Sequence, residues 1–188
     1  MCLFLLLGPG PASAGTHWAW MVEPSFMDYK VRRKIDGSER TILALVRFRD
    51  GEIYGAEGGH DRIMNMAMKK IDPEALQTAA EVLSGIKPQF VRNKNGVIQY
   101  AALESGNPLT ASCVLAPGFA EKFADTLGPD LLVALPNRNQ LLVFSRQDQV
   151  FSKMGEYIIS GYLGSNYPVS REIFSLKNGK LRSLGVLQ

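Results

Sequence analysis

Short apolar runs, separated by glycine, proline and asparagine, follow one another along most of this chain. The clearest case is residues 127–163, LGPDLLVALPNRNQLLVFSRQDQVFSKMGEYIISGYL, where two apolar runs flank the turn residues 136–139 and an amphipathic stretch follows. Apolar runs of this length between turn residues are typical of strands, and apolar residues three or four apart indicate a helix. The segment therefore predicts a ββα unit.

The same signals predict three further hairpins. Asp50-Gly51, Asn95-Gly96 and Asn178-Gly179 are dipeptides that favour tight turns between antiparallel strands. An additional strand is expected before the turn residues 36–39. Outside the ββα unit and the last hairpin, strands are expected at 26–35, 41–48, 52–56, 90–92 and 97–103.

Helical periodicity is clear in four places. Asp72 followed by Pro73 predicts a boundary between two helices, because aspartate favours the N-cap and proline the first helical position. The helices are expected at 61–71, at 73–84, at 117–127 and after residue 145, the last with Met154, Tyr157 and Ile158 facing a sheet.

These elements predict an α+β fold of antiparallel hairpins with packed helices. Residues 42–71 and 131–163 share the order strand, turn, strand, helix, and each is followed by a hairpin with the letters KNG at its turn. The two ββα units are therefore candidates for an internal duplication. The alternative is that ββα is a common pattern and KNG a common turn.

The first twenty residues differ from the rest. An apolar run at 2–7 is followed by Ala12-Ser13-Ala14 before Gly15, which has the form of a signal-peptidase site. This predicts a leader at 1–20 and an exported or periplasmic protein, with one domain at 21–188. The run is short and no basic residue precedes it, so the alternative is a cytoplasmic protein that starts at Met21 or Met27. A membrane span would need about 20 apolar residues, which the leader lacks.

Composition changes this picture little. The chain has 188 residues, of which 46% are hydrophobic and 21% charged, with a formal net charge of +3. These values are ordinary for a globular domain and exclude a disordered chain or a disulfide scaffold. The positive charge permits an anionic partner without requiring one.

The C-terminal part resembles a known family. The run LGPDLLVALPNRNQLLVF, the helix after it, the closing REIFSLKNGKLRSL and the earlier LTASCVLAPGFAEKFADTL are similar to the YtpQ family of uncharacterised bacterial proteins. The resemblance covers about residues 106–184. Asn139 stands where the family often has aspartate in the turn. The resemblance implies the fold and no activity.

Residues that could carry catalysis are few. The sequence has no nucleotide-binding, zinc or hydrolase motif, so we expect no cofactor and no metal. An enzyme would have to use His60 and Asp61, with Cys113 as a nucleophile. The apolar neighbours of Cys113 favour a buried small hydrophobic residue instead.

A glycine-rich turn before the helix at 61–71 is a second candidate site. Gly58 and Gly59 would let a ligand approach the free N–H groups of the helix start, which attract anions. The acidic Glu57 and Asp61 oppose anion binding and suit helix capping. A flexible capping turn is the simpler interpretation.

Basic residues alternate on two expected strands. Lys30, Arg32 and Lys34 lie on the first, and Arg47 and Arg49 on the second. Because alternate residues of a strand face the same side, a hairpin would gather these cations on one sheet face and attract an anionic partner. The alternative is a solvated outer face.

Two function classes follow. The first is an exported, non-enzymatic binding or interaction module with an anionic ligand or a protein partner. Arg138, at the tip of the turn 136–139, is a further exposed cation in this interpretation. Nucleic acid is disfavoured as a partner for two reasons. Proteins that bind it usually interleave aromatic residues with the basic ones, and they are usually more basic than this chain. The alternative is an enzyme with a cleft around His60, Asp61 and Cys113.

Overall fold

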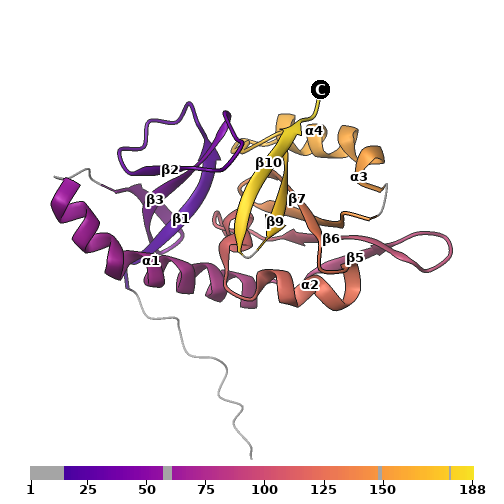
Figure 1. Ribbon diagram of the computed structural model, residues 1–188, viewed down its shortest axis with the longest axis horizontal. Helices are drawn as coiled ribbons and strands as arrows, with labels where there is room; N and C mark the ends of the chain where they lie inside the picture. Colours follow the sequence, from indigo (N-terminus) through magenta and orange to yellow (C-terminus); the bar gives the residue numbers. More distant parts are fainter. Residues whose placement is uncertain (1–14, 57–60, 148–149, 178) are drawn as a thin grey trace, which may run out of the picture.

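Two antiparallel sheets form the protein, as the computed structural model in Figure 1 shows. The structure describes residues 15–56, 61–147, 150–177 and 179–188. The predicted α+β class is confirmed. The small sheet has the order β1-β3-β2, with β4 also paired to β3, and the large sheet has the order β10-β9-β7-β8-β6-β5.

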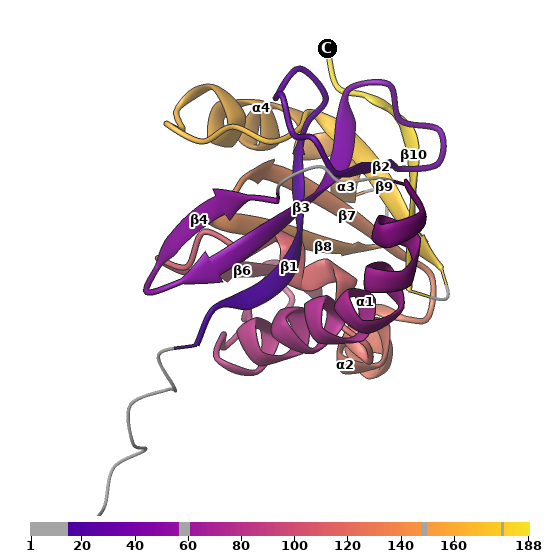
Figure 2. The ribbon, with the colours of Figure 1, turned by 90° about the vertical axis from the view of Figure 1, so that its left-hand side faces the viewer.

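The small sheet is built around β3. Strand β1 pairs with one edge of β3, and β2 and β4 share the other edge. Trp20 and Leu45 face the helix α1, where they pack with Ile71 and Ala75. Figure 2 shows α1 running beneath this sheet. The bounds are β1 (His17–Pro24), β2 (Arg32–Lys34), β3 (Thr41–Arg49), β4 (Glu52–Gly55) and α1 (Asp61–Ser84).

The large sheet has helices on both faces (Figure 1). Phe119 and Phe123 of α2 pack on one face against a cluster that also includes residues of the 3-10 helix η1. Ile158 of α4 packs on the other face against Leu142 and Phe144. The bounds are β5 (Gln89–Arg92), β6 (Ile98–Glu104), η1 (Ala111–Leu115), α2 (Phe119–Leu127), β7 (Leu131–Asn137), β8 (Gln140–Ser145), α3 (Val150–Lys153), α4 (Gly155–Leu163), β9 (Glu172–Lys177) and β10 (Lys180–Val186).

The predicted duplication is wrong. Strand β9 of the last hairpin pairs with β7, the first strand of its ββα unit. The β5–β6 hairpin makes no equivalent pairing with β3 or β4, because β6 pairs with β8 of the large sheet instead. The two KNG hairpins therefore extend the same sheet from opposite sides, and their shared letters reflect a common turn.

The helices depart from prediction at two boundaries. Helix α1 runs through Pro73 as one element, so Asp72 lies inside it and does not cap a second helix. Its carboxylate accepts hydrogen bonds from Trp20 Nε1 at 2.9 Å and from Arg33 at 2.7 Å. The helix after β8 is divided at Met154, whose φ of −96° and ψ of 2° are not helical. Tyr157, expected to face the sheet, is 45% exposed.

The predicted leader boundary and the first predicted strand also need correction. Residues 17–20 belong to β1, where His17 pairs with Phe48, and Trp20 with Leu45. Trp20 is only 4% exposed, so the small sheet needs these residues for its core. The strand expected at 26–35 is reduced to residues 32–34, and Phe26 is 75% exposed.

Within the described part of the chain, no helix combines the length and the apolar character that crossing a membrane requires.

Candidate anion-binding site

The predicted basic face of the small sheet does not form. Arg32 lies opposite Ala44 of β3, whereas Arg47, three positions further along β3, lies opposite Tyr54 of β4. Directly paired residues face the same side and neighbours alternate, so Arg32 and Arg47 lie on opposite faces. The prediction that one face gathers these cations is therefore wrong.

The same alternation separates Lys34 from Arg49, since Lys34 pairs with Ile42 and Arg49 with Glu52. Lys30 precedes β2 and lies outside the sheet. The cations that the sequence placed together are thus divided between the two faces and the two ends of β3.

Arginines on the α1 side of the small sheet lie over aromatic rings. Because a cation over a ring is attracted by the ring's electrons, each of these arginines has a structural partner within the sheet. Arg33 has a second partner, since it forms an ion pair with Asp72 of α1 at 2.7 Å. The pairs are Arg33 over Trp20 at 4.2 Å, Arg47 over Trp18 at 4.6 Å and Arg49 over Tyr54 at 5.8 Å.

Arg138, expected to be exposed, joins the two sheets instead. Its guanidinium donates two hydrogen bonds to the Glu23 carboxylate, at 2.7 and 2.8 Å, and lies over the Tyr167 ring. The Glu23 side chain is 2% exposed and that of Arg138 is 16% exposed. The hydrogen bonds with Glu23 raise the pKa of Arg138. Burial, followed by the charge of Glu23, raises the pKa of the adjacent Tyr29.

Of the three predicted catalytic residues, Cys113 has a described side chain. Cys113 lies in η1 and is fully buried, and burial raises the pKa of its thiol to about 12. His60, Gly58 and Gly59 lie outside the described residues, as does the side chain of Asp61, whose backbone begins α1. Across the described side chains, no group of three histidine, cysteine or acidic residues could hold a metal ion.

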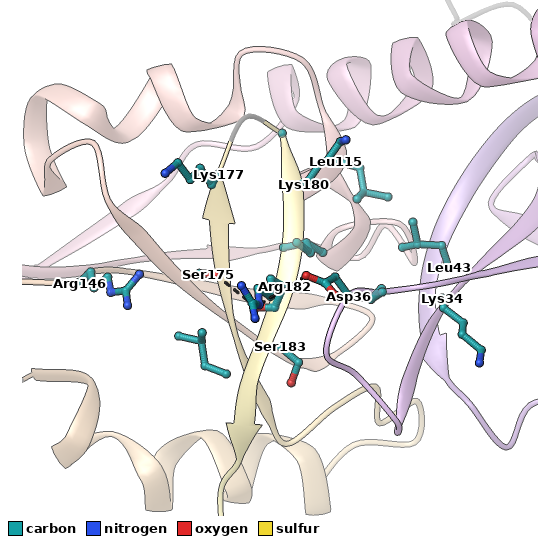
Figure 3. A pocket seen from close by; sticks show the side chains of 14 residues that line it. Lys34, Asp36, Leu43, Leu115, Arg146, Ser175, Lys177, Lys180, Arg182 and Ser183 are labelled. Carbon is teal, nitrogen blue, oxygen red and sulfur yellow. Dashed lines mark hydrogen bonds and ion pairs between the residues drawn. The ribbon is translucent and has the colours of Figure 1, made fainter.

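A groove along the β9–β10 hairpin is the strongest candidate site. It has a volume of about 910 Å3 and lies where β10 approaches the small sheet (Figure 3). We call it the β10 groove. Among the described residues, its lining contains one acidic residue, Asp36, and five basic ones, which are Lys34, Arg146, Lys177, Lys180 and Arg182.

Asp36 and Gly37 hold the two sheets together at this groove. Strands β2 and β10 are edge strands of their sheets, and Asp36 forms a bridge with Arg182 of β10. The N–H of Ser183 donates to the Asp36 carbonyl oxygen at 2.8 Å. Gly37 has a φ of +70°, and a Cβ there would lie 2.9 Å from the Ser183 carbonyl oxygen. Glycine is therefore required for this close approach.

Most of the basic side chains in the β10 groove have no ion-pair partner within the described ranges. The Asp36 carboxylate lies 3.4 Å from Arg182 Nε, in a pair whose side chains are 74% and 70% exposed. Among the residues that the structure describes, no carboxylate forms an ion pair with Lys34, Arg146, Lys177 or Lys180. The groove therefore attracts anions.

The rest of the lining is largely aliphatic. Leu43 and Leu115 are partly buried and Leu184 is 49% exposed. Figure 3 shows Lys180 extending from β10 toward Leu115, so cationic and apolar groups share one wall. The remaining aliphatic residues of the lining are Ile35 and Leu181.

A buried carboxylate lies directly behind the groove. Glu172 is 2% exposed, and its oxygens accept hydrogen bonds from Ser38 at 2.7 Å, from Ser183 at 2.9 Å and from Thr41. Ser38 and Thr41 belong to the small sheet's side of the junction, whereas Ser183 lines the groove. These hydroxyl donors replace water around the buried charge.

Sequence reasoning missed most of this site. Lys34 is one of the candidate residues from the sequence, whereas Lys180 and Arg182 are predicted only as part of the strand after a turn. Their alternation in KLR was a signal that they share one side of β10. Nothing in the sequence indicated that β10 would lie beside Lys34.

The chain was compared with protein families, with curated proteins and with solved structures, and no family model, no curated protein and no solved structure matches it.

Proposed function

We propose that this protein is a non-enzymatic binding module that takes an anionic ligand in the β10 groove. One observation supports this most: in the described part of the chain, five basic side chains and one carboxylate line the groove. Clustered like charges repel one another, and a bound anion would relieve that repulsion.

The shape of the groove agrees with a ligand site. Its volume of about 910 Å3 lies within the range of roughly 300–1,000 Å3 that is common for small-molecule pockets. A concave surface lined by one sign of charge also concentrates the field and speeds the arrival of oppositely charged ligands. Binding should therefore weaken as salt is added.

The enzyme alternative has less support among the described residues. A catalytic cysteine needs a thiolate, and the Cys113 thiol is buried with a raised pKa. Cys113 also does not line the β10 groove.

Two further expectations remain part of the proposal. Export rests on Ala12-Ser13-Ala14 before Gly15, and kinship with the YtpQ family rests on residues 106–184. Intact mass of protein made with its upstream region tests the first, since cleavage after Ala14 leaves Gly15 as the first residue.

The binding proposal is tested by charge reversal. We expect inositol hexakisphosphate, a compact polyanion, to bind the protein in calorimetry at low salt. In the double variant K180E/R182E its affinity should fall by about tenfold or more, roughly 1.4 kcal/mol, because two groove cations become anions.

The matched control is K94E/K153E, which makes the same change in net charge at exposed positions outside the groove. It should retain most of the affinity. Equal losses in both double variants would mean that the anion responds to net charge alone, and the groove would not be the site.

A further inference from the structure

The β10 groove combines its cations with an aliphatic lining, and this combination restricts the ligand class. Leu43, Leu115 and Leu184 line the same groove as the basic side chains and keep part of their surface exposed, whereas Ile35 and Leu181 of the lining are buried in the core. A purely hydrophilic anion would pair with the cations and leave this apolar surface in water. A ligand with both an anionic head and a hydrocarbon body would cover it, which is favourable.

From this pairing, and resting on the proposed function, we infer that the β10 groove binds a free, single-chain anionic amphiphile. The carboxylate or phosphate head contacts Lys180 and Arg182, and the alkyl chain lies along Leu43, Leu115 and Leu184. The groove is large enough for such a molecule, at about 910 Å3.

A peptide that extends the large sheet fits less well. Strand addition needs free backbone groups on the edge strand. On β10 the Ser183 N–H already donates to the Asp36 carbonyl oxygen, and Asp36 is bridged to Arg182. The loop at Asp36 and Gly37 therefore occupies the middle of the edge that a peptide strand would need.

Single-stranded nucleic acid fits less well for a different reason. Its bases bind proteins by stacking on aromatic side chains beside a basic track. No aromatic residue lines the β10 groove among the described residues. The arginine-covered rings of Trp18 and Tyr54 belong to the small sheet and do not line it either.

The test compares chain length and head charge in calorimetry with monomeric ligands. Acetate, octanoate and dodecanoate form the chain series, and dodecyl phosphate tests the head. Dodecyl maltoside and dodecyltrimethylammonium are the neutral and cationic controls. We expect affinity to rise with chain length, by up to about fourfold for each fully buried methylene, and only for anionic heads. Circular dichroism confirms that the protein stays folded.

Variants locate the site. L184Q places an amide on the exposed apolar wall and should weaken dodecanoate binding, whereas L163Q, at a 72% exposed position outside the groove, should not. K180Q/R182Q should weaken dodecanoate and inositol hexakisphosphate alike.

The outcomes separate the two proposals. If inositol hexakisphosphate binds through Lys180 and Arg182 but chain length has no effect, the amphiphile inference is wrong and the anion site stands. If neither anion binds, or if K180Q/R182Q binds both normally, both proposals are wrong. Binding to anionic vesicles without binding of monomeric dodecanoate would also overturn the inference, because the ligand would then be a membrane surface.

Discussion

Three charged side chains are largely removed from water by the fold, and protein groups take the place of water around each of them. They are Glu23, Arg138 and Glu172. Glu23 and Arg138 neutralise each other through two hydrogen bonds. Glu172 forms no ion pair among the described residues and accepts hydrogen bonds from hydroxyl groups, such as those of Ser38 and Ser183. A buried charge costs several kcal/mol without such compensation, so these contacts fix how the sheets meet.

Removing Arg138 should therefore be costly. We expect R138A to lower the free energy of unfolding by about 3–5 kcal/mol, because the Glu23 carboxylate would remain buried without a partner. Urea denaturation measures the change. R182A removes the exposed pair with Asp36 and should cost about 0–1 kcal/mol. Similar losses in the two variants would contradict a buried ion pair at Glu23.

The Cys113 thiol should be inert in the folded protein. Its pKa is raised from 9.0 to about 12 by burial, so at pH 8 we expect alkylation of a C2S variant only after denaturation. The folded pKa lies above the unfolded one. The thiol's stabilising contribution is therefore complete below about pH 9 and is lost as the pH rises toward about 12.

The free energy of unfolding, followed between these pH values, checks the second part of this prediction. C113A lacks the thiol and should show a shallower decline over the same range. Fast alkylation of the native protein at pH 8 would show that Cys113 is accessible.

At the scale of elements, local sequence signals predicted most strands. They failed where contacts between distant residues determine the boundaries of an element. The hairpins at Asn95-Gly96 and at residues 136–139 form as expected, because their turn residues and apolar runs are local. Pro73 was expected to begin a helix, yet α1 continues through it while Asp72 binds Trp20, a residue far away in the chain. No local pattern reports such a contact.

The turn at Gly37 provides a sharp test of how the elements meet. Gly37 and Gly96 have nearly the same positive φ, +70° and +79°, but only Gly37 has a neighbour that an added Cβ would meet. We expect G96A to cost about 1–2 kcal/mol for the left-handed conformation alone. G37A should cost more, since its Cβ would lie 2.9 Å from a backbone oxygen.

Chemical denaturation of both variants gives the comparison. Equal losses of stability in the two variants would mean that β10 can move away from the loop without lowering the free energy of unfolding. The Asp36 bridge would then not hold the sheets in register.

At the scale of the molecule, the two sheets share one core. Val22 and Ile35 of the small sheet's side belong to the same buried cluster as Phe119, Val133 and Phe174 of the other side. The β10 groove exists because this packing places Lys34 and Lys180 on the lining of one groove. The sequence could identify each cation, but their meeting depends on pairing across the whole chain.

A shared core predicts a single unfolding transition. Both tryptophans of the chain, Trp18 and Trp20, lie on β1 and report on the small sheet. Cys113 packs in the cluster that the two sheets share, so its alkylation in a C2S variant reports on the opening of that common core. We expect the urea midpoints of fluorescence and of thiol exposure to coincide. A fluorescence transition at lower urea would show that the small sheet unfolds on its own.

The contacts of Glu23 and Thr41 also determine when the protein can fold. Their partners Arg138 and Glu172 lie 115 and 131 positions further along the chain. Contacts between such distant residues slow folding, because a long loop must close before they form. The N-terminal half of a growing chain therefore emerges before Arg138 and Glu172 have been made, with Glu23 and Thr41 still without these partners. During synthesis this half is the part most in need of protection from aggregation.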